Sequence, residues 1–116
     1  MQTNHFLTLL AAELKSCEED VHDLEKLCHD RFQAREITNY VHMENDALLK
    51  QEASGIGSIR KELESLDHDS YASIDEAYAA VVSLVEQTVK QRQLPRAIVP
   101  LVTRRAERLR DFVLLD

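Results

Sequence analysis

An apolar residue recurs every three or four positions along the first quarter of the chain. Between His5 and Asp30 the spacings are 4, 4, 3, 4, 3 and 4, which is typical of a coiled-coil-like seam on one helix face. The residues of this seam are Phe6, Leu10, Leu14, Cys17, Val21, Leu24 and Cys28. With Asn4 as the expected N-cap, the pattern predicts a helix over about residues 5–31.

Two further apolar faces follow. After a short turn near residues 33–35, a second helix over about 36–67 is expected to carry Ile37, Val41, Leu48, Ile56, Ile59, Leu63 and Leu66. Ser73 and Glu76 form a capping-box pattern, in which hydroxyl and carboxylate each satisfy a free backbone donor. A third helix therefore begins near Ile74, and helical segments are predicted over 74–94 and 98–114.

Gly55 and Gly57 interrupt the second helical pattern. Each costs about 1 kcal/mol relative to alanine inside a helix. Two explanations stay open: close approach of a neighbouring helix, or a frayed turn.

The composition favours long helices over a sheet. The 116 residues contain two glycines and two prolines, and 44% are hydrophobic, which suits a single domain over 1–116 rich in helix formers. We expect an all-α fold: an elongated antiparallel bundle of three long helices, the last kinked or split near Pro95–Pro100.

Both prolines lie within six residues, Pro95 to Pro100. Inside a helix a proline removes a hydrogen bond and clashes with the preceding turn, at about 3 kcal/mol, and it pushes the preceding residue away from helical geometry. One interpretation is a bend that follows the bundle. The other is a hinge at Pro95 and Pro100 that lets residues 98–114 swing out and offer an apolar face to a partner helix.

Charge is unevenly distributed. The net charge is −7, but residues 1–76 carry 17 acidic against 7 basic residues, whereas residues 90–116 carry 7 basic against 3 acidic residues. An acidic surface argues against general nucleic-acid binding, and 5% aromatics argues against a base-stacking platform. The basic end is expected to contact an acidic partner or the acidic helices of its own fold.

The expected location is the cytoplasm, without membrane insertion. Cys17 and Cys28 are eleven residues apart, roughly 16 Å along one helix, which is too far for a disulfide. Both cysteines are expected to be small core residues, and the protein is expected to occupy a reducing compartment, where thiols stay free. The first residues lack a signal-peptide pattern, and no apolar run reaches the roughly 18 residues of a membrane span.

A polar stripe beside the first seam is the candidate for metal binding. It comprises Glu18, His22, Glu25 and His29. Glu19 and His22 also form a Glu-x-x-His pair, but a di-iron site needs a second such pair from another helix. Neither His42 nor His68 has a glutamate three positions before it. We therefore expect a solvent-exposed stripe without a metal ion, in which glutamate and histidine side chains one turn apart pair with each other.

Catalytic motifs are missing from the sequence. There is no glycine-rich phosphate loop and no G-x-S-x-G elbow, and thiols in an apolar seam keep a raised pKa and low reactivity. We expect neither an enzyme nor a cofactor.

The layout of the chain resembles the FlgN-type flagellar export chaperones, which are small cytosolic helical proteins of type III secretion. Three stretches carry the resemblance: "FLTLLAAELKSCEEDVHDLEKLCHD", "REITNYVHMENDALLKQ" and "LVEQTVKQRQLPRAIVPLVTRRAERLRDFV". In the third, the family shows a helix that runs into a segment gripping a partner.

The resemblance implies a chaperone that binds the C-terminal helices of hook–filament junction proteins. The expected apolar contacts are Ile98, Val102, Leu109, Phe112 and Val113. The expected cations that steer an acidic client are Arg104, Arg105, Arg108 and Arg110. The alternative interpretation is a helical adaptor or regulatory module without a chaperone role, which homo-oligomerises through its seams, for example as a homodimer.

Overall fold

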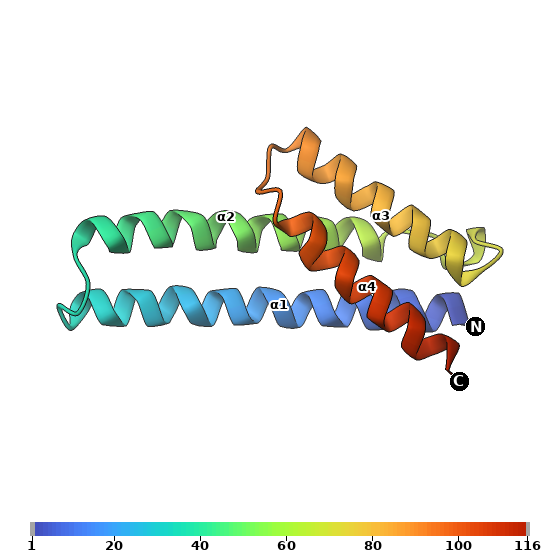
Figure 1. Cartoon of the computed structure of the whole chain (residues 1–116), viewed down its shortest axis with the longest axis horizontal. Coiled ribbons are helices and arrows are strands. Elements are labelled where there is room, and N and C mark those ends of the chain that lie inside the picture. The colour runs from blue at the N-terminus through green and yellow to red at the C-terminus, as the bar shows by residue number, and fades with distance from the viewer. Residues whose placement is uncertain (1, 116) are drawn as a thin grey trace.

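The structure is a computed structural model and describes residues 2–115 (Figure 1). Its elements are α1 (Gln2–Gln33), α2 (Asn39–Glu64), the short 3-10 helix η1 (His68–Ser70), α3 (Ile74–Gln91) and α4 (Ile98–Leu114). The described residues include no strand, so the predicted all-α class is confirmed. The count of three long helices is wrong, because the last predicted helix is two separate helices.

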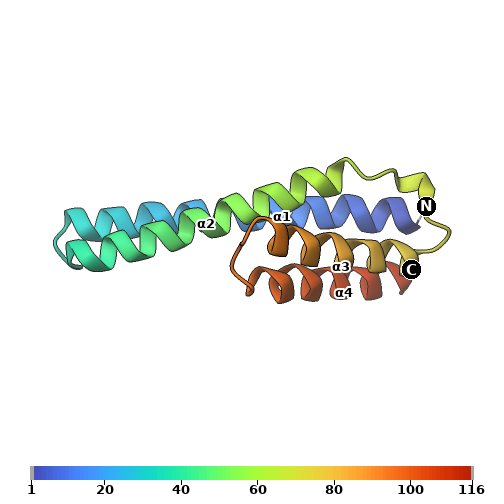
Figure 2. The same ribbon diagram turned by 90° about the horizontal axis from the view of Figure 1, so that it is seen from above.

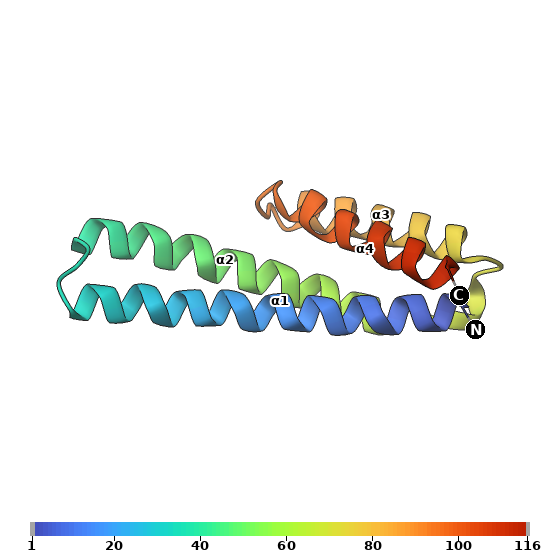
Figure 3. The same cartoon turned by 60° about the horizontal axis from the view of Figure 1, so that its bottom comes forward.

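α1 and α2 form an antiparallel hairpin, and α3 and α4 cover one half of it. The 32 residues of α1 span roughly 48 Å, whereas the 18 and 17 residues of α3 and α4 span roughly 27 Å each. Figures 2 and 3 show both shorter helices on the same side of the hairpin, at the end that holds the two chain termini. The other half of the hairpin consists of two helices alone.

The core lies where the four helices meet. Its largest fully buried side chains are Phe6, Leu7, Leu10, Leu14, Ile56, Ile59, Leu63, Val81, Val85, Ile98, Val102 and Val113. The predicted seam of α1 is buried from Phe6 to Val21 and then becomes exposed at Leu24. That change coincides with the point where α3 and α4 stop covering the hairpin. Within residues 2–115, no helix has the length and apolarity needed to cross a membrane.

The tip of the hairpin is closed by a left-handed residue that is not glycine. Arg35 has a φ of 62°, and the Glu36 N–H donates to the Arg31 carbonyl at 2.9 Å, which together form a Schellman C-cap. Thr38 then caps α2, its hydroxyl oxygen accepting from the Val41 N–H at 3.2 Å. The predicted turn exists, but α2 begins at Asn39 and not near residue 36.

Two predicted caps have different outcomes. At α3 the Ser73 hydroxyl accepts from the Glu76 N–H at 3.2 Å, and the Glu76 carboxylate accepts from the Ala72 N–H at 2.9 Å, so the capping pattern is confirmed. The Asn4 cap is wrong. α1 already begins at Gln2, and Asn4 Oδ1 instead lies 2.5 Å from Nδ1 of His68 in η1.

The prolines separate α3 from α4. α3 ends in a second Schellman cap, in which Gln93 has a φ of 52° and the Leu94 N–H donates to the Val89 carbonyl at 2.9 Å. Pro95 lies in the connection, and Pro100 is the third residue of α4. A proline costs no hydrogen bond there, because the first N–H groups of a helix have no intrahelical partner.

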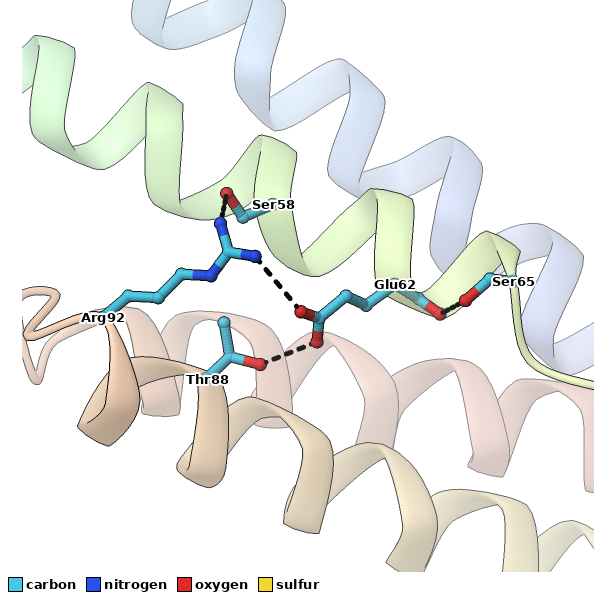
Figure 4. Close-up of polar contacts among 5 residues, drawn as sticks. All are labelled: Ser58, Glu62, Ser65, Thr88 and Arg92. Carbon is cyan, nitrogen blue, oxygen red and sulfur yellow. Dashed lines mark hydrogen bonds and ion pairs between the residues drawn. The ribbon is translucent and has the colours of Figure 1, made fainter.

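A polar network fastens the end of α3 to α2 (Figure 4). The buried Thr88 hydroxyl donates to Glu62 Oε2 at 2.9 Å, and the Arg92 guanidinium donates to Ser58 Oγ at 3.0 Å and to Glu62 Oε1 at 3.5 Å. Thr88 is buried with its hydroxyl satisfied, as a buried polar group must be to avoid a desolvation penalty. The network fixes where the chain reverses.

The two glycines of α2 are explained by close approach, and the frayed-turn alternative is wrong. Both lie inside the continuous helix α2 and are buried. A Cβ on Gly55 would lie 2.7 Å from Ile98 Cδ1 and 3.2 Å from Leu94 Cδ1, and one on Gly57 would lie 2.5 Å from Glu18 Oε1. Gly55 therefore lets the α3–α4 connection sit directly on α2.

Gly55→Val is expected to destabilise the protein by about 2 kcal/mol, because its side chain must displace Leu94 or Ile98 in a packed region. Urea unfolding followed by circular dichroism measures the change. Ala47→Val, on an exposed face of the same helix, is the matched control and should cost about 0.5 kcal/mol from helix propensity alone. Equal losses for the two variants would contradict the close-approach explanation.

Candidate functional site

The predicted partner-binding stripe of α4 is mostly in the core. Ile98, Val102 and Val113 are at most 1% exposed. Leu109 is half-buried and packs against the core, and Phe112 is 54% exposed. A partner reaches the first three residues only if α4 leaves the bundle, so the apolar stripe is not a surface of the folded protein.

The predicted steering arginines are divided in the same way. Arg105 Nε lies 3.6 Å from Glu13 Oε1 on α1, and Arg110 lies 4.4 Å above the Tyr78 ring and 4.0 Å from Asp75 on α3. Arg104 and Arg108 are exposed. Two of the four cations are thus engaged by acidic and aromatic groups of the protein's own helices.

The polar stripe of α1 is divided among separate neighbours. Glu18 accepts from Arg60 Nε at 2.5 Å, His22 Nδ1 lies 3.4 Å from Glu25 Oε1, and the His29 ring packs at 5.7 Å against that of His42. Among residues 2–115, no group of three histidine, cysteine or acidic residues is arranged to hold a metal ion.

The uncovered half of the hairpin carries an apolar groove of about 390 Å³ between α1 and α2. We call it the distal groove, and it is lined by Leu24, Leu27, Cys28, Arg31, Ile37, Val41, Asn45, Leu48 and Leu49. Leu24, Leu27 and Leu48 keep 50%, 47% and 48% of their surface exposed. These three half-exposed leucines gather in one groove, which makes the distal groove the candidate site of this structure.

The distal groove continues the surface on which α4 packs. Along α1, Glu13 pairs with Arg105 of α4, and positions 13, 17, 20, 24, 27 and 31 follow each other at spacings of three or four, which places them on one helix face. α4 covers the first part of that face, and no helix of residues 2–115 lies over the part from Leu24 to Arg31. The distal groove therefore lies beside α4 on the same face of the hairpin.

Carboxylates flank every half-exposed leucine of the distal groove. Asp20 stands one turn before Leu24, Asp23 one turn before Leu27, and Glu44 and Glu52 one turn on either side of Leu48. In the described chain none of the four makes an ion pair. Arg31 is the one cation among the described residues that line the groove, and it has Glu36 at 4.0 Å. The rim of the groove is therefore acidic.

The walls of the groove are held in place without a third helix. The Phe32 and His42 rings stack across the hairpin at 4.5 Å and within 6° of parallel. The Asn45 amide donates to the Val41 carbonyl at 2.9 Å, and the Schellman and Thr38 caps fix the tip. A preformed groove binds a partner with less loss of conformational entropy.

The two cysteines differ in environment. Burial, partly offset by the nearby Arg105 charge, raises the pKa of the Cys17 thiol. Cys28 is half-buried and lines the distal groove. The prediction that both are core residues is right for Cys17 and wrong for Cys28, because neither α3 nor α4 covers α1 at Cys28.

Apolar periodicity predicts buried seam positions for Leu24, Val41 and Leu48, which are exposed in the structure, so it does not predict the distal groove. Each is an apolar residue three or four positions from other apolar residues. This periodicity predicts which face of a helix is apolar, but not which element packs over that face. The length of the segments was the usable signal: once the chain breaks between residues 91 and 98, neither α3 nor α4 is long enough to cover the whole hairpin.

Comparison with known proteins adds no relative. No family model matches the chain, and no curated protein and no solved structure matches it.

The distal groove should make Cys28 the faster-reacting thiol. With the thiol reagent DTNB at about pH 8, we expect Cys28 to be modified at least tenfold faster than Cys17, since the raised pKa and burial of Cys17 keep thiolate scarce and inaccessible. Cys28→Ser should remove the fast phase, and Cys17→Ser should leave it unchanged. A fast phase that survives Cys28→Ser would contradict this description of the groove.

The role of α4 in the core is tested by truncating side chains on its two faces. Val102→Ala should lower the free energy of unfolding by about 2 kcal/mol, because it leaves a cavity in the four-helix end. Phe112→Ala, at a half-exposed position, should lower it by about 1 kcal/mol or less. Urea unfolding compares the two, and equal small losses would mean that α4 does not belong to the core.

Proposed function

We propose that the protein is a non-enzymatic binding protein that captures an amphipathic helix of another polypeptide in the distal groove. The single observation that carries the proposal is the cluster of half-exposed leucines on a preformed two-helix surface that α3 and α4 leave uncovered. Completing the burial of Leu24, Leu27 and Leu48 contributes roughly 1 kcal/mol each. Helix-in-groove recognition relies on contacts of this kind.

The class of client comes from the resemblance to FlgN-type export chaperones. On that basis the protein is a cytoplasmic chaperone whose clients are the C-terminal helices of hook–filament junction proteins. A helix with an apolar stripe that is destined for assembly needs that stripe covered beforehand. The distal groove provides such a cover while α4 stays in the core, which differs from the expectation that residues 98–114 make the contact.

The test compares an in-groove variant with a matched variant outside the groove. Leu48→Glu is expected to weaken the binding of a labelled client peptide at least thirtyfold, because it places a charge where apolar contact is needed. Met43→Glu changes an exposed apolar residue of the same helix that does not line the groove, and should change binding by less than about twofold. Fluorescence anisotropy with a peptide from the C-terminal helices of a hook–filament junction protein provides the measurement.

Because Leu48 is half-exposed, both variants should fold, which circular dichroism verifies. Unchanged binding by Leu48→Glu would overturn the assignment of the groove. If Val102→Ala weakened binding while Leu48→Glu did not, the C-terminal segment would be the binding surface instead.

A further inference from the structure

We infer that the distal groove selects a helix whose apolar stripe is flanked by lysine or arginine residues. This inference rests on the proposed function, and it names the partner's chemistry. The partner's charge is then opposite to the one expected from the arginines of α4, which predicted an acidic client.

The rim of the distal groove is negatively charged. Asp20, Asp23, Glu44 and Glu52 stand beside the exposed leucines and make no ion pair in residues 2–115. Residues 20–52 carry eight acidic against four basic residues, a net of −4. Two of the four cations pair with two of the eight acids, Arg31 with Glu36 at 4.0 Å and Lys50 with Asp46 at 2.8 Å, which leaves six acidic against two basic residues. A helix docked here meets mainly uncompensated carboxylates.

An arginine-flanked helix, α4, already packs on α1 within the molecule. α4 lies on the preceding stretch of the same α1 face, and its apolar stripe is flanked by arginines. One of them, Arg105, reaches Glu13 of α1. In spacing along α1, Asp20 stands seven residues after Glu13, which is two turns further along the same face. The distal groove thus repeats the combination of apolar floor and carboxylate rim that already holds an arginine-flanked helix.

The same charges disfavour a second copy of the chain as occupant. Two distal grooves facing one another would bring two rims of net −4 together around an apolar contact. Like charges juxtaposed at an interface oppose association and select against the wrong partner. A cation-flanked helix meets no such opposition.

The experiment uses two synthetic helical peptides of about 18 residues with the same leucine stripe on an alanine background. One carries lysine at the positions beside the stripe, and the other carries glutamate. Fluorescence anisotropy with the full-length protein at about 0.05 M salt should show the lysine peptide binding at least tenfold more tightly. At about 0.5 M salt the ratio should fall toward one, since exposed charges are screened over a few ångströms.

A fourfold charge-neutralised variant tests whether the rim makes this selection. It combines Asp20→Asn, Asp23→Asn, Glu44→Gln and Glu52→Gln, and should reduce the preference for the lysine peptide to less than about twofold. The control variant removes four exposed carboxylates elsewhere, with Glu19→Gln, Asp69→Asn, Glu86→Gln and Glu107→Gln. It changes the net charge equally and should keep most of the preference.

The outcomes separate this inference from the proposed function. If neither peptide binds, the groove is not a helix-docking site and both proposals fail. If both peptides bind equally, or the glutamate peptide binds more tightly, the groove stands and the charge selection is wrong. If the wild type sediments as a dimer that Leu48→Glu converts to monomer, the occupant is a second copy, which also overturns the inference.

Discussion

The reversal of the chain between α3 and α4 determines the rest of the structure. Residues 74–114 as one uninterrupted helix would extend roughly 60 Å, enough to lie along the entire α1–α2 hairpin and bury its seam from end to end. The left-handed Gln93, the connection at Pro95 and the anchoring of Arg92 on Ser58 and Glu62 fold that length back on itself. Gly55 supplies the space in which the reversal sits.

Folding back divides the molecule into two ends with different physical properties. At one end four helices share a core, and each buries its apolar face. At the other end α1 and α2 pack only against each other. The apolar face that each helix carries there stays half exposed, at Leu24 on α1 and at Leu48 on α2. The break between α3 and α4 thus limits how much of the hairpin these helices can cover, and the distal groove lies in the part that they do not reach.

The sequence is sufficient to predict the helices, but it does not predict which helix packs over which apolar face. Periodicity and the Ser73 cap predicted the helical class, the start of α3 and the range of α4. The ends of α1 and α3 are harder to predict from the sequence. Both helices end at a left-handed residue that is not glycine, Arg35 and Gln93, so the glycine that usually marks a helix end is missing. Burial of Val102 and exposure of Leu24 depend on which helix lies opposite, which an apolar period does not specify.

The acidic rim also explains how an apolar groove can stay exposed in a free protein. Half-exposed leucines at the end of a two-helix hairpin invite self-association, and a carboxylate one turn from each of them opposes it by charge repulsion and hydration. A neutral rim would leave the leucines free to pair with another copy, and a basic rim would repel a helix like α4. Repulsion between copies and the proposed selection of a cationic helix therefore both depend on the same four carboxylates, Asp20, Asp23, Glu44 and Glu52.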